Sequence, residues 1–315
     1  MVKDIDLLAT LSRWFDAEAY SANLSDERHF NLLRLLPFIL LHLGCLAALY
    51  VGVSTTALVI CALMYLIRMF AITAFYHRYF AHRTFKTNRF WQFIFAFIGN
   101  SAAQRGPLWW AAHHRHHHQH SDSEQDLHSP LQQGFWWSHV GWFSCNAAFK
   151  TPWQRIRDFA QFPELRFINR FDALAPAILG ISLYALGELL AVYAPHLNTN
   201  GAQLFVWGFV ISTVLLFHAT VTINSLGHVW GKRRFNTRDD SRNNAFLALL
   251  TLGEGWHNNH HRFPAATRQG FYWWQLDICY AVLWLLAKLG IVWDLKPVPQ
   301  HILQEGRKSQ GHKNA

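Results

Sequence analysis

Histidine is the residue type in this chain whose number and spacing could do chemistry. The chain has 315 residues and 20 histidines, and nine of these fall in three short clusters. The clusters occupy residues 77–82 (HRYFAH), 114–118 (HRHHH) and 257–261 (HNNHH). Imidazole nitrogen is a good ligand for iron, zinc and copper. The clusters therefore predict metal binding, although histidine ligands alone do not choose the metal.

The spacing within the clusters indicates how they are presented. The second and third clusters contain the pattern His-x-x-His-His, whose three histidines share one face of an α-helix. Two such helices facing each other, with ligands from the first cluster, can enclose two metal ions. His77 and His82 stand five residues apart, about 140° on an ideal helix, which allows them to serve different metals.

Further polar residues lie close to the clusters in the sequence. Asn224 and His228 are four residues apart and project together from a helix. Asp122, Asp126 and His128 follow the second cluster and could hold its imidazoles in one tautomer. A polar cap at the end of a helix is an equally good interpretation of these three residues.

Five other histidines are expected to do less. His113, His116 and His120 fall on the opposite helix face from the second cluster's ligands, and we interpret them as a solvated or headgroup-facing surface rather than a second metal site. His42 and His218 lie inside apolar stretches, where an ionisable residue raises a functional hypothesis. As single neutral imidazoles, they are interpreted as hydrogen-bonded packing residues.

Long apolar stretches must position the histidines. Hydrophobic residues make up 51% of the chain and charged residues 15%, well below the quarter typical of soluble domains. No charged residue occurs from Leu35 to Ile67, which is too long for one membrane crossing, and residues 52–54 (GVS) near its middle indicate a hairpin. A second apolar pair is split by the turn residues 195–201. We expect four spans, at about 35–52, 54–75, 173–194 and 204–223.

The basic residues predict an orientation. Of 28 Lys and Arg, four precede the first span, 11 lie between Arg78 and Arg170, 12 follow Asn224, and Arg68 is inside the second span. Since neither hairpin loop carries one, both termini and the large central loop are expected to be cytoplasmic. The basic residues that give the net charge of +9 are expected to face anionic lipid headgroups or an anionic substrate, so no nucleic-acid partner is needed to explain them. The four cysteines are scattered and predict neither disulfides nor a cysteine metal site.

The expected architecture is an all-α membrane protein: four transmembrane helices in two hairpins, with a cytoplasmic helical cap that carries the histidine-rich di-metal site. Residues 90–103 are short for a span and favour an interfacial or re-entrant helix. Residues 270–293 are interrupted by Asp277 and Lys288, and favour an amphipathic helix packed under the bundle. The expected divisions are 1–34, a cytoplasmic N-terminal segment, 35–270, the main domain, and 271–315, the amphipathic helix with a basic tail.

With these elements placed, the chain resembles the membrane fatty acid desaturases, specifically their delta-9 acyl-CoA and acyl-lipid branch. The matching stretches run from residue 77 to 264 in the family's order: HRYFAHRTFKTNRFWQF, GPLWWAAHHRHHHQHSD, DLHSP, GFWWSHVGWF, NSLGH and GEGWHNNHHRFP. The resemblance implies two iron ions, nine histidine ligands and one asparagine that reaches a metal through water. These map to His77, His82, His114, His117, His118, His228, His257, His260, His261 and Asn224.

The resemblance also implies a reaction and its partners. O₂ would remove two hydrogens from a saturated acyl chain, carried by CoA or by a lipid, to give a cis double bond. We expect electrons from a separate protein of ferredoxin or cytochrome b5 type. Trp109 stands where the family usually has an acidic residue, which leaves lipid-linked substrates open.

The acyl chain needs a narrow apolar tunnel beside the metals. We hypothesise that residues of the second span form its floor, although lipid-facing packing would account for them equally well. The residues considered for the tunnel are Met64, Tyr65, Leu66, Met69, Gln104, Trp110 and Trp142.

Two alternatives stay open from the sequence. A di-iron lipid hydroxylase or ketolase would share the architecture and yield an oxygenated product instead of an alkene. A membrane metal transporter or storage protein could also carry many histidines. Transporter loops usually carry disordered histidine runs, whereas here the triplets keep helical register.

Overall fold

The structure is a computed structural model that describes residues 14–18 and 32–311. In this part of the chain every regular element is a helix, and β-structure is limited to isolated bridges such as Lys86–Trp293. The predicted all-α fold is confirmed. The expected segment 1–34 lies largely outside the described residues.

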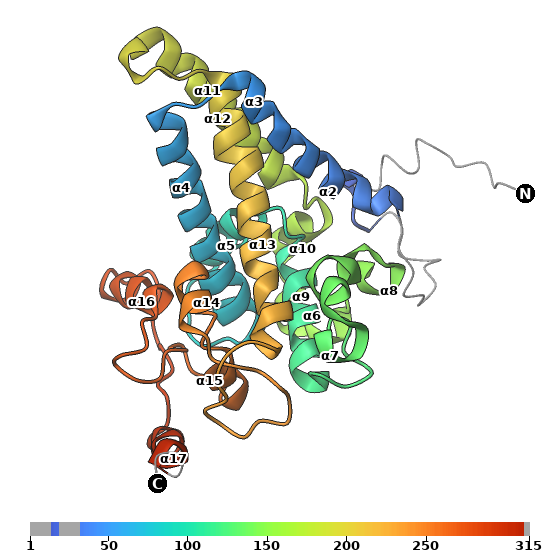
Figure 1. The fold of residues 1–315 in the computed structure, drawn as a ribbon, viewed down its shortest axis with the longest axis vertical. Helices are drawn as coiled ribbons and strands as arrows, with labels where there is room; N and C mark the ends of the chain where they lie inside the picture. The colour runs from blue at the N-terminus through green and yellow to red at the C-terminus, as the bar shows by residue number, and fades with distance from the viewer. Residues whose placement is uncertain (1–13, 19–31, 312–315) are drawn as a thin grey trace, which may run out of the picture.

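Long apolar helices form a bundle at one end of the molecule (Figure 1). Three continuous helical stretches are long and apolar enough to cross a membrane: Thr55–Ala81, Leu174–Tyr193 and Gly201–His228. The first joins α4 (Thr55–Phe70) to a π-helix, Ala71–Ala81. The second is α11 (Leu174–Tyr193). The third begins with α12 (Gly201–Leu204), continues as a π-helix, Phe205–Ile211, then α13 (Ser212–Ser225), and ends in a 3₁₀ turn, Leu226–His228.

The expected first span is a shorter helical run. It consists of α2 (Leu32–Gly44), a 3₁₀ turn, Cys45–Ala47, and α3 (Ala48–Val51). Its apolar part, Leu35–Val51, is at the lower limit of the length that crosses a bilayer. A fourth crossing therefore stays a prediction.

The two hairpin turns lie against each other. Gly52 reverses the chain at a φ of 70°, and Ser54 caps α4 by accepting a hydrogen bond from the Ala57 amide. In the second turn Asn200 caps α12 in the same way. The Ser54 hydroxyl donates to Gln203 Oε1 (2.8 Å), and the Thr56 hydroxyl donates to the Leu197 carbonyl (3.0 Å). These bonds hold the two helical pairs in register at the end far from the three histidine clusters.

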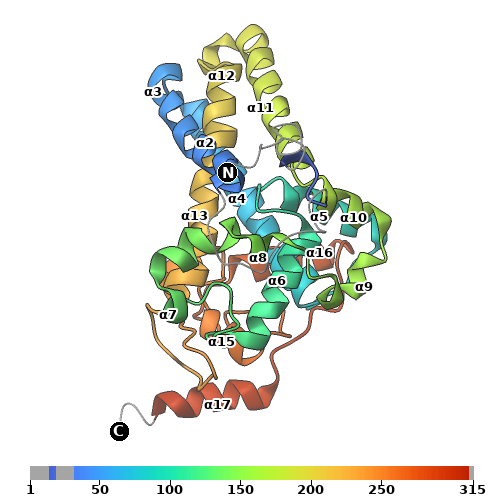
Figure 2. The same cartoon turned by 90° about the vertical axis from the view of Figure 1, so that its right-hand side faces the viewer.

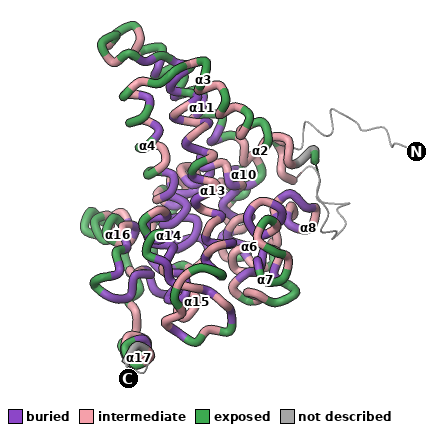
Figure 3. The backbone as a smooth tube through the Cα atoms, viewed as in Figure 1, coloured by how far each residue is buried: buried purple, intermediate pink, exposed green. Residues whose placement is uncertain are grey.

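A layer of shorter helices covers the opposite end of the bundle (Figure 2). The buried residues concentrate where this layer meets the long helices, whereas the hairpin end is largely exposed (Figure 3). The expected short apolar helix at 90–103 is α5 (Arg89–Asn100). The layer also contains α6 (Pro107–His120), α7 (Pro130–Gln133), α8 (Asn146–Phe149), α9 (Arg157–Ala160), α10 (Pro163–Arg170), α14 (Ala245–Leu250), α15 (His257–Arg262) and a π-helical turn, Trp137–Gly141.

The single amphipathic helix expected at 270–293 is shorter than predicted. The chain forms α16 only over Ile278–Lys288, and a separate helix, α17, over Gln300–Gly311. Asp277, which interrupts the apolar run, caps α16 by accepting from the Tyr280 amide (2.9 Å). Its carboxylate also pairs with the buried guanidinium of Arg78 (3.0 Å). The acid therefore starts the helix and ties it to the bundle.

Candidate metal centre

Nine histidines meet beneath the apolar bundle and separate into two groups. The first contains His77, His82, His114, His118 and His260. The second contains His117, His228, His257 and His261. Within each group, one nitrogen per ring lies within 4.8 Å of the others, so each group could hold a metal ion. These nine residues are the histidines that the sequence pattern singled out.

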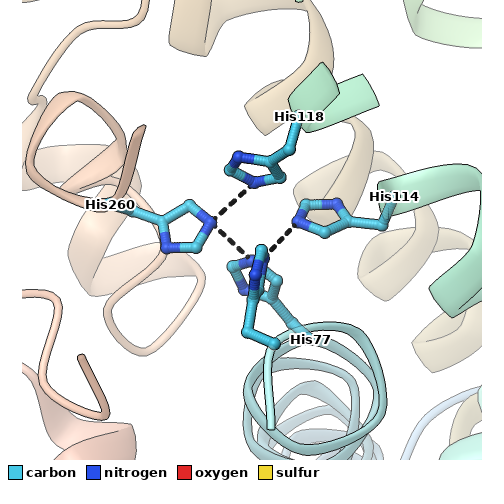
Figure 4. A group of neighbouring side chains, drawn as sticks. His77, His114, His118 and His260 are labelled. Atoms are coloured by element: carbon cyan, nitrogen blue, oxygen red, sulfur yellow. Dashed lines mark hydrogen bonds between the residues drawn. The ribbon is translucent and has the colours of Figure 1, made fainter. Parts of the chain in front are cut away.

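Rings of the five-histidine group point at one another from three separate segments (Figure 4). His260 Nε2 lies 2.9 Å from the Nε2 atoms of His77 and of His118. His114 Nε2 lies 2.9 Å from His82 Nε2. Several nitrogen atoms with free lone pairs facing one another this closely favour a shared cation at the centre.

The π-helix explains how His77 and His82 come to serve one group. The His82 amide donates to the His77 carbonyl (3.2 Å), which is the five-residue hydrogen bond of a π-turn. This winding brings residues five apart nearly above each other, and the ring centroids lie 4.9 Å apart. The expectation from an ideal α-helix, that the two could serve different metals, is wrong.

Each His-x-x-His-His helix contributes to both groups. In α6, His114 and His118 belong to the first group and His117 to the second; in α15, His260 belongs to the first, while His257 and His261 belong to the second. His228, at the end of the third long helix, places its Nε2 3.0 Å from that of His257. Each helix thus supplies histidines to both groups, as expected for two facing helices that enclose two metal ions.

Carboxylates hold the far nitrogen of four ligand candidates. His117 Nδ1 lies 3.0 Å from Asp126, and His228 Nδ1 lies 2.8 Å from Asp122. The sequence had suggested both acids as partners, although it did not connect Asp122 with His228. An Nδ1–H that donates to a carboxylate leaves Nε2 with its lone pair directed at the centre.

Two further acids were missed. Glu254 pairs with His77 Nδ1, and Asp239 pairs with His261 Nδ1 (2.7 Å). Glu254 lies three residues before the third cluster, so its proximity was a usable signal. Asp239 lies in a polar loop 22 residues from His261, and nothing in the sequence marks it.

Charge balance at these pairs is set by burial and by the partner. Burial opposes ionisation of Asp122, but the hydrogen bond and charge of His228, together with the bonds from the Asp240 amide and the Ser129 hydroxyl, outweigh it and lower the pKa of Asp122 to about 2. Burial likewise raises the pKa of Asp126, but its charged and hydrogen-bonding neighbours, His117 above all, lower it well below its usual range. Negative charge therefore surrounds the centre.

Five other rings of the two groups are kept neutral. Burial, reinforced by neighbouring imidazoles, lowers the pKa values of His82, His114 and His118 well below 6.5, and does the same for His257 and His260. His261 Nε2 is buried without a hydrogen-bond partner. Neutral imidazoles with an unshared lone pair are the form that binds a metal, so the donor set fits two cations.

His128 lies behind the second group. Its ring packs on His117 (centroids 4.4 Å apart), and its Nδ1 lies 3.6 Å from Asp126. His117, Asp126 and His128 form a third grouping that could hold a metal, but it shares His117 and its acid already holds that ring. We interpret His128 as a packing partner of the second group.

A cavity of about 470 Å³ borders the centre. His114, Asn224 and three of the residues considered for a tunnel line it: Gln104, Trp110 and Trp142. The Trp110 ring stacks on His114, and Gln104 donates to the Thr220 hydroxyl (2.9 Å). The cavity therefore reaches from the first histidine group into the bundle.

The four second-span residues lie outside this cavity. Met69 is buried in the core, Leu66 is 45% exposed, and the Tyr65 hydroxyl donates to the Leu250 carbonyl (2.7 Å). Met64 is half-buried one turn before Arg68. A tunnel floor formed by these residues stays a prediction.

Five other histidines are hydrogen-bonded away from both groups: His42, His113, His116, His139 and His218. His42 Nε2 lies 2.9 Å from His218 Nε2, and His218 Nδ1 lies 3.1 Å from His139 Nε2, which joins α2, α13 and the turn at 137–141. His42 and His218 are hydrogen-bonded, as predicted, and His42 also lines the cavity. His113 contacts the Lys150 carbonyl and His116 the Gln125 carbonyl, so neither faces the centre. His113 is buried, so the expectation that it lies on a solvated or headgroup-facing surface is wrong.

Comparison with known proteins agrees with this geometry. The family model described as fatty acid desaturase matches residues 24–295. A palmitoyl-monogalactosyldiacylglycerol delta-7 desaturase of Arabidopsis thaliana is 38% identical over 231 residues, which cover 72% of this chain and 58% of the relative. An acyl-CoA C20 delta5-desaturase of Anemone leveillei is 36% identical over 77% of this chain and 74% of the relative.

A third relative matches along nearly its whole length. An sn-1 stearoyl-lipid 9-desaturase of Anabaena variabilis is 34% identical over 275 residues, 86% of this chain and 96% of the relative. All three relatives are desaturases by name, and the family model spans most of the chain. The chain therefore belongs to the fatty acid desaturase family, whose members are oxidoreductases that act on fatty acyl chains.

Proposed function

We propose that the two histidine groups bind two iron ions, with which the protein inserts a cis double bond, at the delta-9 position, into a saturated acyl chain. One observation carries the proposal: nine buried or half-buried imidazoles divide into sets of five and four beside a cavity that enters an apolar bundle. The relatives named for desaturation at carbon 9 support the position of the double bond.

In this proposal the ligands of one iron are the five-histidine group, and those of the other are the four-histidine group with Asn224 acting through water. Asn224 lies in α13, four residues before His228 of the second group, and its side chain lines the cavity. This position supports the proposed role. Asp122 and Asp126, with Glu254 and Asp239, keep the ligand rings oriented.

Bound iron would supply, with O₂, the oxidising power to remove hydrogen from an unactivated methylene, which no acid or base in the chain can do. The overall balance is one saturated carbon–carbon bond, one O₂, two electrons and two protons giving one alkene and two waters. The protein's own residues position the acyl chain: the cavity brings it past Trp110, which stacks on His114, and the Gln104–Thr220 hydrogen bond fixes the adjacent wall.

We further propose that the centre and both termini lie on the cytoplasmic side of a multi-pass membrane protein with four spans. The hairpin turns at 52–54 and 195–201 carry no Lys or Arg, which supports this orientation. Electrons would come from a separate ferredoxin or cytochrome b5 type protein. The divisions 1–34, 35–270 and 271–315 complete this proposal.

Expression in a host that lacks unsaturated fatty acids tests the function. Wild-type protein is expected to carry two irons per chain and to yield an unsaturated product by gas chromatography. His117→Ala and His260→Ala should each lose iron and product. His116→Ala is the matched control, because it removes an imidazole from the same cluster that faces away from the centre. A hydroxylated product, or full activity in His260→Ala, would overturn the proposal.

A further inference from the structure

The cavity beside the centre follows one helix into the bundle. Along α13 and the preceding π-helix, its lining extends from Asn224 back to Phe209. This run spans roughly 22 Å at 1.5 Å per residue. The cavity therefore leads away from the two histidine groups into the apolar part of the molecule, where apolar side chains would surround an acyl chain.

Two other helices supply the side walls. Phe38 and Leu41 come from α2, and Ala173 and Pro176 come from the start of α11. In Figure 2, α2 crosses in front of the long helix that contains α13, and α11 runs alongside that helix. Phe38 and Leu41 on α2 and Ala173 at the start of α11 are each partly exposed, as are Trp14 and Phe15, which also line the cavity, so the cavity reaches the molecular surface near these segments.

The surface around that opening is apolar. Leu40 and Leu43 on α2 are 52% and 56% exposed, and Ile178 and Ile181 on α11 are 41% and 70% exposed. Because α11 is long and apolar enough to cross a membrane, these side chains would face lipid. The opening thus faces the acyl region of a bilayer rather than water.

The polar rim offers no free positive charge among the lining residues that the structure describes. Among the described lining residues, Arg105 alone is a Lys or Arg. Its guanidinium pairs with Asp172 (Nε to Oδ2, 3.2 Å). It also donates to the Phe149 carbonyl and stacks over the Phe149 ring, 3.9 Å from the centroid. The phosphates of coenzyme A require unpaired cationic donors, which this rim does not provide.

We infer that the acyl substrate is esterified to a membrane glycerolipid and enters sideways from the bilayer, between α2 and α11. The inference rests on the proposed desaturase function and specifies its acyl carrier. A glycerolipid keeps its headgroup at the membrane surface, near Arg105 and Asp172 at the start of α11, while its acyl chain extends between the helices towards the histidines.

The first test compares carriers with the purified, iron-loaded protein in vesicles. One set of vesicles contains phosphatidylcholine, phosphatidylglycerol and monogalactosyldiacylglycerol with deuterated stearoyl chains. The other set has unlabelled lipids and receives deuterated stearoyl-CoA or stearoyl acyl carrier protein. NADPH, ferredoxin reductase and ferredoxin supply electrons to both. Deuterated alkene is expected in the glycerolipid and not in either thioester.

Narrowing the opening provides the second test. Leu41→Trp and Ala173→Phe place bulk in the side walls and should reduce lipid desaturation about tenfold or more. Leu46→Trp, in the turn that follows α2, and Ala177→Phe on α11 are the controls, and are expected to stay within about twofold of wild type because both side chains are exposed and neither lines the cavity. Iron content and elution volume should be unchanged in all four variants.

A binding measurement separates the inference from the function. Phosphatidylcholine with a diazirine in its acyl chain should cross-link to α2, α11 and α13, and Leu41→Trp should weaken the cross-link. Conversion of the thioesters alone would overturn the glycerolipid assignment while leaving the desaturase function intact. Conversion of no carrier by the iron-loaded protein would overturn the desaturase function and this inference with it.

Discussion

Asp122 Oδ2 lies 2.8 Å from His228 Nδ1. Asp122 belongs to the loop after α6, and His228 ends the third long apolar helix. The two residues are 106 positions apart in sequence and meet beside the candidate metal centre. The same carboxylate accepts from the Asp240 amide (2.8 Å). The Asp122 side chain therefore orients His228 and joins the loop after α6 to the loop that contains Asp240.

Replacing Asp122 with Asn should weaken the hold on the second metal. The amide keeps the shape but cannot balance an imidazole–metal unit with negative charge, and loss of such a partner typically costs about 10–100-fold in metal affinity or activity. Iron retention against a chelator measures the change. Glu124→Gln, which alters an exposed acid in the same loop, is the control and should behave as wild type.

Removing Arg78 should destabilise the fold strongly. Its guanidinium is 1% exposed, pairs with Asp277 and donates to the Thr267 carbonyl (2.8 Å). Arg78→Met leaves the Asp277 carboxylate buried without its cation, which typically costs about 3–5 kcal/mol. Thermal unfolding in detergent checks this. The control is Lys86→Met, because Lys86 pairs with Asp294 at an exposed site and its loss should barely move the midpoint.

Lowering the pH should destabilise the metal-free protein at pH values where the Asp and Glu side chains are still ionised. Burial depresses the pKa of His261 to about 4, and those of His82 and His257 well below 6.5. Below about pH 6.5 the unfolded chain takes up protons that the folded chain does not, so stability falls as pH falls. The midpoint of chelator-treated protein is expected to drop between pH 7 and pH 5. An unchanged midpoint over this range would contradict the pKa shifts.

Trp142 offers an unused donor to the substrate. Its indole nitrogen is buried without a hydrogen-bond partner, and the side chain lines the cavity next to His128. A donor here would hold the acyl carbonyl and so fix which carbons reach the metals. Trp142→Phe keeps a ring but removes the N–H, and is expected to yield a mixture of double-bond positions by mass spectrometry. Trp136→Phe, at an exposed position nearby, is the control. A single unchanged position in Trp142→Phe would rule out this role.

Local pattern determined much of this protein. Apolar length placed α4, α11 and the α12–α13 helix within a few residues of their bounds, because burying or immersing a helix requires continuous apolar sequence. Helical spacing singled out the six histidines of the two His-x-x-His-His patterns, because ligands on one face of a helix must recur every three or four residues, and the resemblance to the desaturases supplied the full set of nine. The short helix α5 followed from the same reasoning.

Tertiary structure decided how those residues are shared. His117 and His118 are neighbours in sequence but belong to different groups, because a pair of facing helices places each ring by its direction rather than its order. The π-turn reversed the expected separation of His77 and His82. Asp239 reaches His261, and the cavity passes by α2 and α11 instead of Met64 and Met69, since contacts between distant segments arise only when helices pack. The sequence therefore identified the candidate ligands, and helix packing determined how they divide into two groups and where the cavity runs.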